Sequence, residues 1–590
     1  MMCGIAGLMT FNGKPPAKSV LDAFASALAH RGPDGEGRHV VGNVGMVQRR
    51  LAIIDLETGD QPLYDSAGTA LIANGEVYNY LELRDEFGPK VFKTRSDCEP
   101  PILLYHRDGI DFARNLRGMY SIALHDPAQE KLILTRDPFG IKPLYYAETK
   151  EGFAFASEPQ AFFAAGLLTP EIDDNRLDEL LQMQFTCGDT TIYKGVERVK
   201  PGETLVIRRG RIIERTYLPS LPDGPTTDQP IGDAIEALDA VLEESVSVHQ
   251  RSDVPYGLFL SGGIDSSAIL ALMAKLNEKP VQTFTIGFTF SGVSDEREHA
   301  RELAESVGSI HTEVAFSEAD FWRSLPTIAA AMDDPAADYA ILPTWKLASV
   351  ASQELKVVLS GEGGDELFAG YGRYRRLLRP WWRGGRTIRE RGTFDKLKVL
   401  RKAPHAWRDS IASMEASGST SPRSKLQIAQ ATDCRDWLPN DLLTKLDRCL
   451  MSHGLEGRTP FLDQKVAGMV FLLKDSLKIS NGRGKWILRQ WLSKILPQAE
   501  PFSRKRGFTV PVGYWISQRG EQLGPLVARL PAIQQICNPT EVIRIFKSND
   551  KHAGFAAWTL LFYALWHRRH IEGFRPDGDV FEVLAANTQL

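Results

Sequence analysis

The chain has 590 residues, and at roughly 100–200 residues per domain this length predicts two to four domains. Its 43% of hydrophobic and 24% of charged residues are ordinary for a globular protein, and a formal net charge of −4 gives no reason to expect a nucleic-acid partner. No run approaches about 18 apolar residues, so we expect no membrane partner. The six scattered cysteines form no Cys-x-x-Cys pair, so we expect free thiols in a cytoplasmic protein, without a disulfide framework or a zinc site.

Short β-type runs separated by Gly, Pro, Asn and Asp dominate the first 215 residues. Helical windows, such as residues 20–29, are fewer. This pattern predicts an α+β domain built on antiparallel sheet. The clearest predicted strands lie at residues 71–73, 120–124, 131–134 and 153–156.

Cys3 lies almost at the start of the sequence, within Cys-Gly-Ile-Ala-Gly. It can be a small buried residue that begins a first strand. Alternatively it is a nucleophile whose own α-amine is the general base, because a free α-amine with a pKa of about 8 can accept a thiol proton at neutral pH. That mechanism requires Cys3 to begin the mature chain. Since Met1 and Met2 precede it, we expect either translation from Met2 or an additional trimming step.

Four further motifs follow Cys3 in order along the chain. They are residues 30–34 (His-Arg-Gly-Pro-Asp), 50–55 (Arg-Leu-Ala-Ile-Ile-Asp), 74–79 (Asn-Gly-Glu-Val-Tyr-Asn) and 96–99 (Ser-Asp-Cys-Glu). Together with Cys3 they resemble the class II glutamine amidotransferase domain, an N-terminal-nucleophile fold with an antiparallel sandwich. The resemblance runs to about residue 200 and implies that the chain cuts ammonia from glutamine.

The chemistry of that reaction matches individual residues. Attack of the Cys3 thiolate on the glutamine amide creates a tetrahedral oxyanion. The resemblance implies that the side-chain amide of Asn74 and the backbone N–H of Gly75 hold this oxyanion. Losing one such donor typically lowers the rate on the order of 100-fold or more. A strand-end turn is the plain alternative for Asn74 and Gly75.

Other residues of the motifs suit the charged ends of glutamine. Arg50 offers a forked donor for the α-carboxylate. Glu76 and Asp97 can accept hydrogen bonds from the ammonium or the amide. We assign Ile53 to the same glutamine pocket. A solvated Arg50 and a helix cap at Asp97 are the plain alternatives. Cys98 is expected to be passive, because it has neither a terminal amine nor a His nearby in sequence.

A Pro-rich break separates two regions of different texture. Four prolines occur between residues 219 and 230, and we place an inter-domain linker at residues 216–232. The proposed division is a glutamine amidotransferase domain at 3–215, an ATP-binding domain at 233–565 and a C-terminal tail at 566–590.

Helical and strand patterns alternate beyond the linker. Ile235, Leu238, Leu242 and Val246 recur at helical spacing. The alternation predicts an α/β domain with a parallel sheet. Buried strands are predicted at residues 256–260, 281–288 and 356–359, and a helix from Ala268.

Residues 260–267 (Leu-Ser-Gly-Gly-Ile-Asp-Ser-Ser) follow the first of these strands and open a helix. The glycines let the backbone bend around an anion, and the N–H groups, the helix N-terminus and the serine hydroxyls offer donors. No Walker A spacing is present. The segment resembles the PP-loop of ATP pyrophosphatases, which bind the pyrophosphate leaving group of ATP. A flexible Gly/Ser turn is the alternative.

A second loop, residues 359–368, follows another apolar run. In an open α/β sheet two such strand-end loops face one crevice, where Asp265 and Asp365 would be ligands of a Mg²⁺ ion that bridges the phosphates. The whole chain to about residue 520 then resembles the asparagine synthetase B family. Further matching segments are residues 285–288, 334–335, 455–463 and 484–489.

The resemblance implies that ATP adenylates the side-chain carboxylate of aspartate, and that ammonia then attacks the acyl-adenylate. Glu362 is the candidate base for the proton that the attacking nitrogen loses. Lys485 is a candidate point charge on the phosphates. The residues assigned to the nucleotide are Leu260, Ser261, Gly262, Gly263, Asp265, Ser266, Ser267, Ile286, Ser360, Gly361 and Lys485.

Two alternatives remain open. The acceptor could be another carboxylate, a sugar or a peptide, because Gly364 replaces the Ser of well-known asparagine synthetases and Gly457 and Thr459 replace their commoner Ala and Val. A catalytically silent scaffold is the other, although the candidate catalytic residues are all retained. A homodimer is possible, an ammonia tunnel is implied by the resemblance alone, and the basic segment 380–430 is predicted to be a mobile surface excursion.

Overall fold

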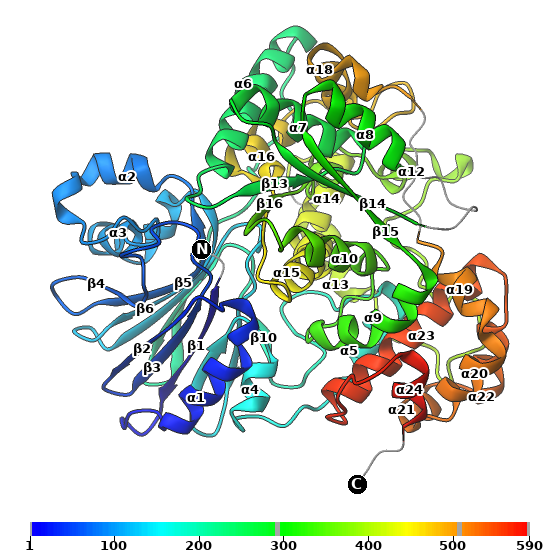
Figure 1. Ribbon diagram of the computed structural model, residues 1–590, viewed down its shortest axis with the longest axis horizontal. Helices are drawn as coiled ribbons and strands as arrows, with labels where there is room; N and C mark the ends of the chain where they lie inside the picture. The colour runs from blue at the N-terminus through cyan, green and yellow to red at the C-terminus, as the bar shows by residue number, and fades with distance from the viewer. Residues whose placement is uncertain (1–2, 289–295, 420, 504–509, 587–590) are drawn as a thin grey trace.

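The computed structural model describes residues 3–288, 296–419, 421–503 and 510–586. Figure 1 shows two halves side by side: an N-terminal half of two packed sheets, in blue and cyan, and a larger half in which helices surround a parallel sheet. Orange and red helices from the end of the chain pack below that sheet. Within the described ranges, no helix is long and apolar enough to cross a membrane.

The N-terminal half is a sandwich of two six-stranded antiparallel sheets, which confirms the predicted α+β class. The first sheet has the order β10-β8-β9-β1-β3-β2 and the second β12-β11-β7-β6-β5-β4. The strands of the first are β1 (Cys3–Thr10), β2 (Gly35–Val41), β3 (Val44–Arg50), β8 (Tyr145–Glu148), β9 (Gly152–Ala156) and β10 (Glu197–Arg198). Those of the second are β4 (Leu63–Tyr64), β5 (Ala70–Val77), β6 (Gly118–Asp126), β7 (Lys131–Arg136), β11 (Glu203–Arg208) and β12 (Arg211–Tyr217).

Alternating apolar residues of the two sheets meet in the middle of the sandwich. Ile5 and Phe155 from the first sheet pack in one cluster with Ile72, Ala123 and Leu134 from the second. Each of these residues is fully buried, as expected for strands whose inner faces form a core. The helices of this half are α1 (Lys18–Ala27), α2 (Tyr80–Phe87), α3 (Pro100–Asp108), α4 (Gln160–Ala164) and α5 (Asp174–Met183), with 3₁₀ turns η1 (Ala29–Arg31), η2 (Pro89–Val91) and η3 (Gly109–Asn115).

The second half is built on a five-stranded sheet of order β15-β14-β13-β16-β17 in which every paired strand is parallel. The predicted parallel sheet is therefore confirmed. Successive side chains of β16 pack into different clusters, Val358 with the helices of one face and Leu359 with those of the other. The strands are β13 (Tyr256–Phe259), β14 (Gln282–Phe288), β15 (Ile310–Phe316), β16 (Val357–Leu359) and β17 (Glu456–Arg458).

Helices cover both faces of this sheet, as parallel sheets require (Figure 1). On one side α6 carries the predicted stripe of Ile235, Leu238, Leu242 and Val246, all buried. The first helices of this half are α6 (Ile231–His249), α7 (Ile264–Leu276), α8 (Arg297–Ser306), α9 (Glu318–Ala331), α10 (Ile341–Ala351), α11 (Gly364–Leu367), α12 (Gly372–Leu377), α13 (Asp409–Gly418), α14 (Lys425–Thr432) and α15 (Thr444–Met451). The later ones are α16 (Gln464–Phe471), α17 (Asp475–Lys478), α18 (Trp486–Ile495), α19 (Val512–Gln518), α20 (Gly520–Ala528), α21 (Pro531–Ile536), α22 (Pro539–Phe546), α23 (Lys551–His570) and α24 (Val580–Ala585).

Short helices of other types complete this half. A π-helical segment, η5 (Asp433–Leu443), joins α14 to α15 without a break. The chain stays helical from Lys425 to Met451. α15 therefore continues directly from η5, and the place of η5 determines the place of α15. The 3₁₀ turns are η4 (Trp381–Arg383), η6 (Pro460–Leu462) and η7 (Pro497–Ala499).

The segment 380–430 differs from the predicted surface excursion. Its apolar residues Ile388, Phe394 and Val399 are buried, at most 4% exposed. The N–H of Phe394 donates to Oε1 of Gln182, and the carbonyl of Val399 accepts from the N–H of Asn538. The prediction of a surface excursion is wrong for these positions. Single apolar residues among the arginines and glycines are buried there, and the segment contacts both halves of the molecule.

Candidate active sites

Cys3 begins β1 and is fully buried. Its Sγ accepts a hydrogen bond from Nε2 of Gln48 at 2.8 Å, and its backbone N–H donates to Oδ1 of Asn74 at 3.0 Å. Burial raises the pKa of the Cys3 thiol to about 11, although Arg50 and the N–H of Leu51 oppose the rise. The thiol is therefore protonated at neutral pH and needs a base to become a nucleophile. Met1 and Met2, on which the expected start site depends, lie outside the described residues.

Asn74 and Gly75 come from β5 in the second sheet and lie beside Cys3. Asn74 gives its Oδ1 to Cys3, and its buried Nδ2 has no hydrogen-bond partner among the described residues. Gly75 has a φ of 147°, and a Cβ there would lie 2.0 Å from the carbonyl oxygen of Met119. Only glycine fits this position, so the backbone beside Asn74 is fixed by packing. The structure thus brings Asn74 to the backbone nitrogen of Cys3, with Gly75 next along the strand.

Arg50 lies beside Cys3 and Ile53 lies in the loop that follows, and both residues make polar contacts with other protein groups. Arg50 pairs with Cys3 in the strand register, and its guanidinium donates to Oδ1 of Asp60 at 2.6 Å and to the carbonyl of Asp55 at 2.5 Å. The carbonyl of Ile53 accepts from the N–H of Asp253, at 3.0 Å, in the second half of the chain. The loop after β3 therefore serves both the thiol and the junction between the halves.

Glu76 and Asp97 form an acidic pair at the same site. Oε2 of Glu76 lies 3.1 Å from Nη2 of Arg458, which β17 of the parallel sheet supplies. Burial raises the pKa of Glu76 to about 7, and the charge of Asp97 adds to the rise. Asp97 accepts from the N–H of Val77 at 2.9 Å, while its buried Oδ1 has no partner within the described ranges.

Of two further residues at this site, Arg458 was not predicted from the sequence and Cys98 was predicted to be passive. Arg458 was missed, because nothing near residue 458 in sequence points to a glutamine pocket almost 400 residues away. Cys98 was expected to be passive, and its thiol is buried and donates to Oδ2 of Asp97 at 3.3 Å. Burial raises the pKa of Cys98 well above its usual range, so this thiol stays protonated.

The Ser-Gly-Gly loop joins β13 to α7, as the sequence predicts. Gly262 has a φ of 65°, a left-handed conformation that suits glycine. The hydroxyl of Ser266 accepts from the N–H of Ser261 at 3.2 Å and donates to the carbonyl of Gly263 at 3.1 Å. These bonds hold the loop open at the N-terminus of a 13-residue helix, where an anion is favoured.

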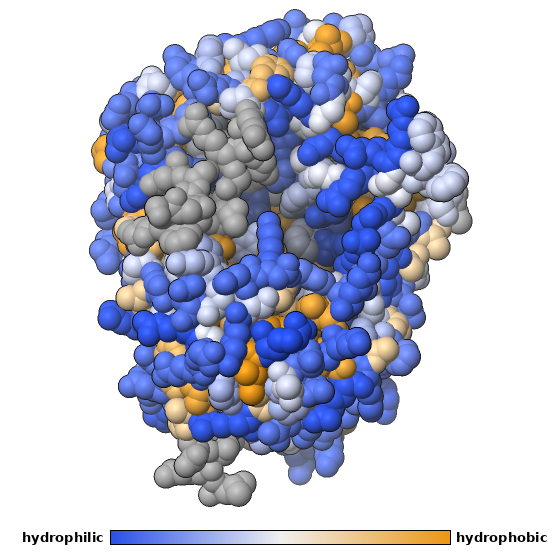
Figure 2. Space-filling model, turned by 90° about the vertical axis from the view of Figure 1, so that its right-hand side faces the viewer, coloured by the Kyte–Doolittle hydropathy of each residue, from blue (hydrophilic) through white to orange (hydrophobic). Residues whose placement is uncertain are grey.

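Two cavities of about 370 and 240 Å³ adjoin this loop. Four residues line both: Ser261, Asp265, Glu296 and Asp365. Figure 2 shows that this side of the molecule is hollowed in its upper half and mostly hydrophilic around the hollow. The larger cavity brings together the predicted nucleotide residues Leu260, Ser261, Asp265, Ser266, Ile286, Ser360 and Gly361, along with Glu362 and Asp365. The smaller one adds Gly262, Gly263 and Lys485, whereas the buried Ser267 lines neither.

Asp265 and Asp365 converge, as predicted from the two strand-end loops. Nζ of Lys485 contacts Oδ2 of Asp265 and lies 2.7 Å from Oδ1 of Asp365. Neighbouring glycines make room for this arrangement. A Cβ at Gly364 would lie 2.6 Å from Oδ1 of Asp265, and one at Gly370 only 1.8 Å from Oδ1 of Asp365. Any larger residue at Gly370 would displace the second carboxylate.

This pair of carboxylates fits the predicted Mg²⁺. The ion typically takes one or two carboxylates and completes its shell with water and substrate phosphates. Asp265 and Asp365 already reach one cationic group and line both cavities. Among the described residues there is no cluster of three or more His, Cys, Asp or Glu side chains that could hold a metal without substrate.

Glu362 lies in the loop after β16 and lines the larger cavity. Its Oε1 lies 3.5 Å from Nζ of Lys445, on α15. The same Nζ donates to Oδ2 of Asp338 at 3.3 Å. Sequence reasoning missed Lys445, since a lone lysine in a helix is usually solvated. The one sequence feature that could have pointed to Lys445 is its position two residues before Asp447 and Arg448 on the same helix.

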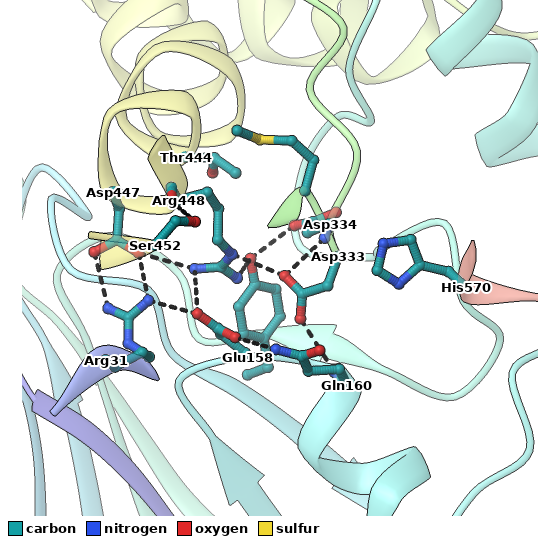
Figure 3. A network of polar contacts seen from close by, with 12 residues as sticks. Arg31, Glu158, Gln160, Asp333, Asp334, Thr444, Asp447, Arg448, Ser452 and His570 are labelled. Carbon is teal, nitrogen blue, oxygen red and sulfur yellow. Dashed lines mark hydrogen bonds and ion pairs between the residues drawn. The ribbon is translucent and has the colours of Figure 1, made fainter. Parts of the chain in front are cut away.

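A buried network of charges joins the two halves (Figure 3). Arg31 of the first half donates to Oε1 of Glu158 at 2.7 Å and makes two bonds to Asp447, at 2.8 and 2.9 Å. Arg448 donates to Asp447 at 2.9 Å and to Asp333 at 2.8 Å. All five side chains are at most 3% exposed. Arg31 also donates to the carbonyl of Cys3 at 3.2 Å, so the network reaches the thiol.

The two candidate sites are also linked through adjacent strands. The N–H of Ser360, in the loop that carries Glu362, donates to the carbonyl of Arg458 at 2.9 Å. The side chain of Arg458 contacts Glu76 at the glutamine site. One residue thus touches both sites, by its backbone on one side and its guanidinium on the other.

Comparisons with known proteins cover almost the whole chain. A family model described as asparagine synthase matches residues 237–568, and one described as glutamine amidotransferase domain matches residues 2–218. The protein named "Asparagine synthetase (glutamine-hydrolyzing) 1" of Bacillus subtilis strain 168 is 32% identical, over 97% of this chain and 97% of its own. "Putative asparagine synthetase (glutamine-hydrolyzing)" of Mycobacterium tuberculosis H37Rv is 33% identical, over 97% and 98%.

More distant similarities extend the same pattern. "Asparagine synthetase B (glutamine-hydrolyzing)" of Escherichia coli K12 is 29% identical, over 87% of this chain and 83% of its own. Among solved structures, "Structure of the allosteric regulatory enzyme of purine biosynthesis" covers 53% of this chain and 80% of its own at 15% identity and a TM-score of 0.30, a match too weak to support an argument.

Proposed function

Because this chain belongs to the asparagine synthase family, we propose that it is a glutamine-dependent asparagine synthetase. It would hydrolyse glutamine to glutamate and ammonia, and use ATP to amidate aspartate with release of AMP and pyrophosphate. The observation that carries the proposal is that one chain holds both a buried thiol beside an unpaired amide donor and a phosphate loop beside Glu362. Hydrolysis of glutamine does not need a phosphate loop, and activation of a carboxylate by ATP does not need a thiol, so the presence of both sites in one chain points to a coupled reaction.

We propose that Cys3 attacks the glutamine amide. In a mature chain that starts at Cys3, its nitrogen would be a free amine held by Oδ1 of Asn74 at 3.0 Å, and it would take the thiol proton. The new C–S bond would place negative charge on the amide oxygen, within reach of Nδ2 of Asn74 and the N–H of Gly75. Ammonia would leave with the proton carried by the amine, and water would hydrolyse the thioester. Gln48, which donates to Sγ, would support the thiolate.

Recognition of glutamine is assigned to the surrounding charges. Arg50 would meet the α-carboxylate, and the acidic pair Glu76 and Asp97 would meet the ammonium. The free Oδ1 of Asp97 supports this role, because a buried carboxylate oxygen without a partner is costly unless a ligand supplies one. Ile53 would contribute packing, since its carbonyl already serves Asp253.

The nucleotide is assigned to the two adjoining cavities. The phosphates would lie on the Ser-Gly-Gly loop, with Leu260 and Ile286 against the base and Ser360 and Gly361 beside the sugar and α-phosphate. Lys485 would move between the carboxylates and the phosphates as a point charge.

Two carboxylates complete the assignment of the nucleotide site. Asp265 and Asp365 would hold Mg²⁺, which when bound neutralises phosphate charge and favours departure of pyrophosphate. Glu362 would take a proton from the attacking ammonia while AMP leaves.

Three broader assignments belong to this proposal. The six cysteines are all unpaired, which fits a cytoplasmic enzyme. The domain division is also part of this proposal, although each of its boundaries falls inside an element: residue 215 in β12 (Arg211–Tyr217), residue 233 in α6 (Ile231–His249) and residue 565 in α23 (Lys551–His570). A homodimer remains a proposal without a described interface.

The test separates the two half-reactions. The protein is incubated with ATP, Mg²⁺, ammonium or glutamine, and a panel of carboxylates, and pyrophosphate and amide are measured separately. Aspartate should give the fastest release of pyrophosphate and equal amide. Cys3→Ala should lose glutamine-dependent but keep ammonium-dependent synthesis, and Asp265→Asn should lose pyrophosphate release. Another carboxylate that outperforms aspartate would change the acceptor, and no release with any acceptor would refute the proposal.

A further inference from the structure

Lys445 occupies an unusual place at the larger cavity. It lies near the start of α15, lines that cavity and is only 5% exposed. Its Nζ stands between two carboxylates from different loops, 3.5 Å from Oε1 of Glu362 and 3.3 Å from Oδ2 of Asp338. A buried lysine is costly unless it is paired, so these contacts account for its charge.

The surroundings of this lysine carry an excess of acid. Asp441, one helical turn earlier, is buried and its carboxylate has no hydrogen-bond partner among the described residues. Glu366 is buried beside the loop of Glu362, and burial raises its pKa to about 8. Burial likewise raises the pKa of Asp441 well above its usual range. Tyr339 and Cys449 are the remaining titratable groups that interact with Lys445.

Lys445 faces Glu362 at close range and has Asp338 on its other side. Burial opposes the charge of Lys445, but Glu362 and Asp338 reverse that effect and raise its pKa above its usual range. Lys445 is therefore charged at neutral pH, and its ammonium offers the carboxylate of Glu362 an ion-pair partner 3.5 Å away.

We propose that Lys445 is a positioning residue for the amide-forming step, holding the carboxylate of Glu362 in place beside the reacting nitrogen. The inference rests on the proposed function. In that step the nitrogen of ammonia forms a bond to the acyl carbon, the bond from that carbon to the AMP oxygen breaks, and AMP leaves with the electron pair. One proton of the attacking nitrogen passes to Glu362, which later gives it to water.

Asp338 has a defined part in this cycle. When Glu362 takes the proton, its attraction for Lys445 falls, and a buried ammonium without a partner would be costly. Asp338 already bonds the same Nζ, so it retains the lysine while Glu362 is neutral. Asp338 therefore keeps Lys445 in place throughout the cycle.

The test measures how much amide is formed for each pyrophosphate released. Lys445→Met should lower this ratio about 10-fold or more, because a misplaced base no longer meets the attacking nitrogen. Asp338→Asn should lower the ratio less, because Lys445 still reaches Glu362. Lys445→Arg should restore most of the yield. Lys346→Met, which removes a partly exposed lysine that pairs with Asp320 and lines neither cavity, should change nothing.

Each outcome distinguishes the inference from the proposed function. If the unaltered enzyme forms amide and Lys445→Met forms as much amide per pyrophosphate, the role of Lys445 is refuted while the function stands. If Lys445→Arg loses as much yield as Lys445→Met, a general structural effect explains both and the inference fails. If Lys445→Met does not fold, Asp338→Asn decides, and an unchanged amide yield per pyrophosphate in that variant refutes the inference. Absence of pyrophosphate release from the unaltered enzyme would refute the proposed function, and the inference with it.

Discussion

Replacing Arg31 with methionine should destabilise the molecule and damage glutamine use together. Arg31 makes three charge-assisted bonds, one to Glu158 and two to Asp447, and every partner is buried. Removing one member of a buried ionic network typically costs about 3–5 kcal/mol, because the remaining charges lose their compensation. Arg448 still reaches both carboxylates, at 2.9 and 3.9 Å, so we expect the lower end, about 3 kcal/mol.

The loss should depend on pH in a defined way. Burial disfavours the charge of Glu158, yet His30, Arg448 and Arg31 together hold its pKa well below its usual range, and the pKa of Asp447 is also lowered. Carboxylates whose pKa is depressed in the folded state stabilise it above their unfolded pKa, and this contribution is lost as the pH falls. The difference between the native protein and Arg31→Met should be constant from pH 8 to about pH 5 and shrink below about pH 4.

Urea unfolding, followed by fluorescence and by circular dichroism, measures this difference, with two probes because a multidomain chain need not unfold in one step. Arg38→Met is the matched control, since Arg38 lies in the same half of the chain, is partly exposed and pairs with the surface carboxylates of Asp22 and Glu36. It should cause a much smaller loss. An Arg31→Met protein whose stability falls by less than about 1 kcal/mol would show that the network contributes little, contrary to the argument from burial.

Three further predictions concern the glutamine site. Asn74→Ala should lower glutamine hydrolysis about 100- to 1,000-fold and leave ammonium-dependent synthesis intact; equal loss of both would contradict the oxyanion role. The KM for glutamine should fall as the pH rises through about 7, because Glu76 ionises there and can pair with the ammonium of glutamine. Glu76→Gln should abolish this dependence of KM on pH. If the dependence in Glu76→Gln is the same as in the unaltered enzyme, Glu76 does not bind glutamine. Intact-mass analysis of active protein should find Cys3 at the N-terminus, and an active form that retains Met2 would exclude the amine as base.

Local patterns in the sequence were enough for the fold class and for the chemistry-bearing loops. The seven strands predicted in the two halves, and the loop between β13 and α7, lie where apolar runs and glycine signals predict them. These signals arise within about ten residues, the scale on which periodicity and turn chemistry act. The contact between Asn74 and Cys3 agrees with what the family resemblance implied, and both residues lie on strands, β5 and β1.

Contacts between distant segments could not be predicted in this way. Arg31 and Asp447 are separated by 416 positions, and Arg458 reaches Glu76 from the other half of the chain. No property of a short window encodes such a pairing. Gly457 is a related case: a Cβ there would lie 2.9 Å from Cδ2 of Leu450, so its small size reflects packing against α15 as well as any choice of substrate.

The network around Arg31 bears on how far the two halves can be exchanged between enzymes. A glutaminase half grafted onto another synthetase would bury Arg31 and Glu158 against whatever residues replace Asp447 and Arg448. Such a graft would assemble only if the recipient carried the complementary charges. The two domains are therefore separate in architecture but matched by the charges at their interface. Chimeras that carry Arg31, Glu158, Asp447 and Arg448 together should assemble, whereas chimeras joined at the linker without these four residues should not.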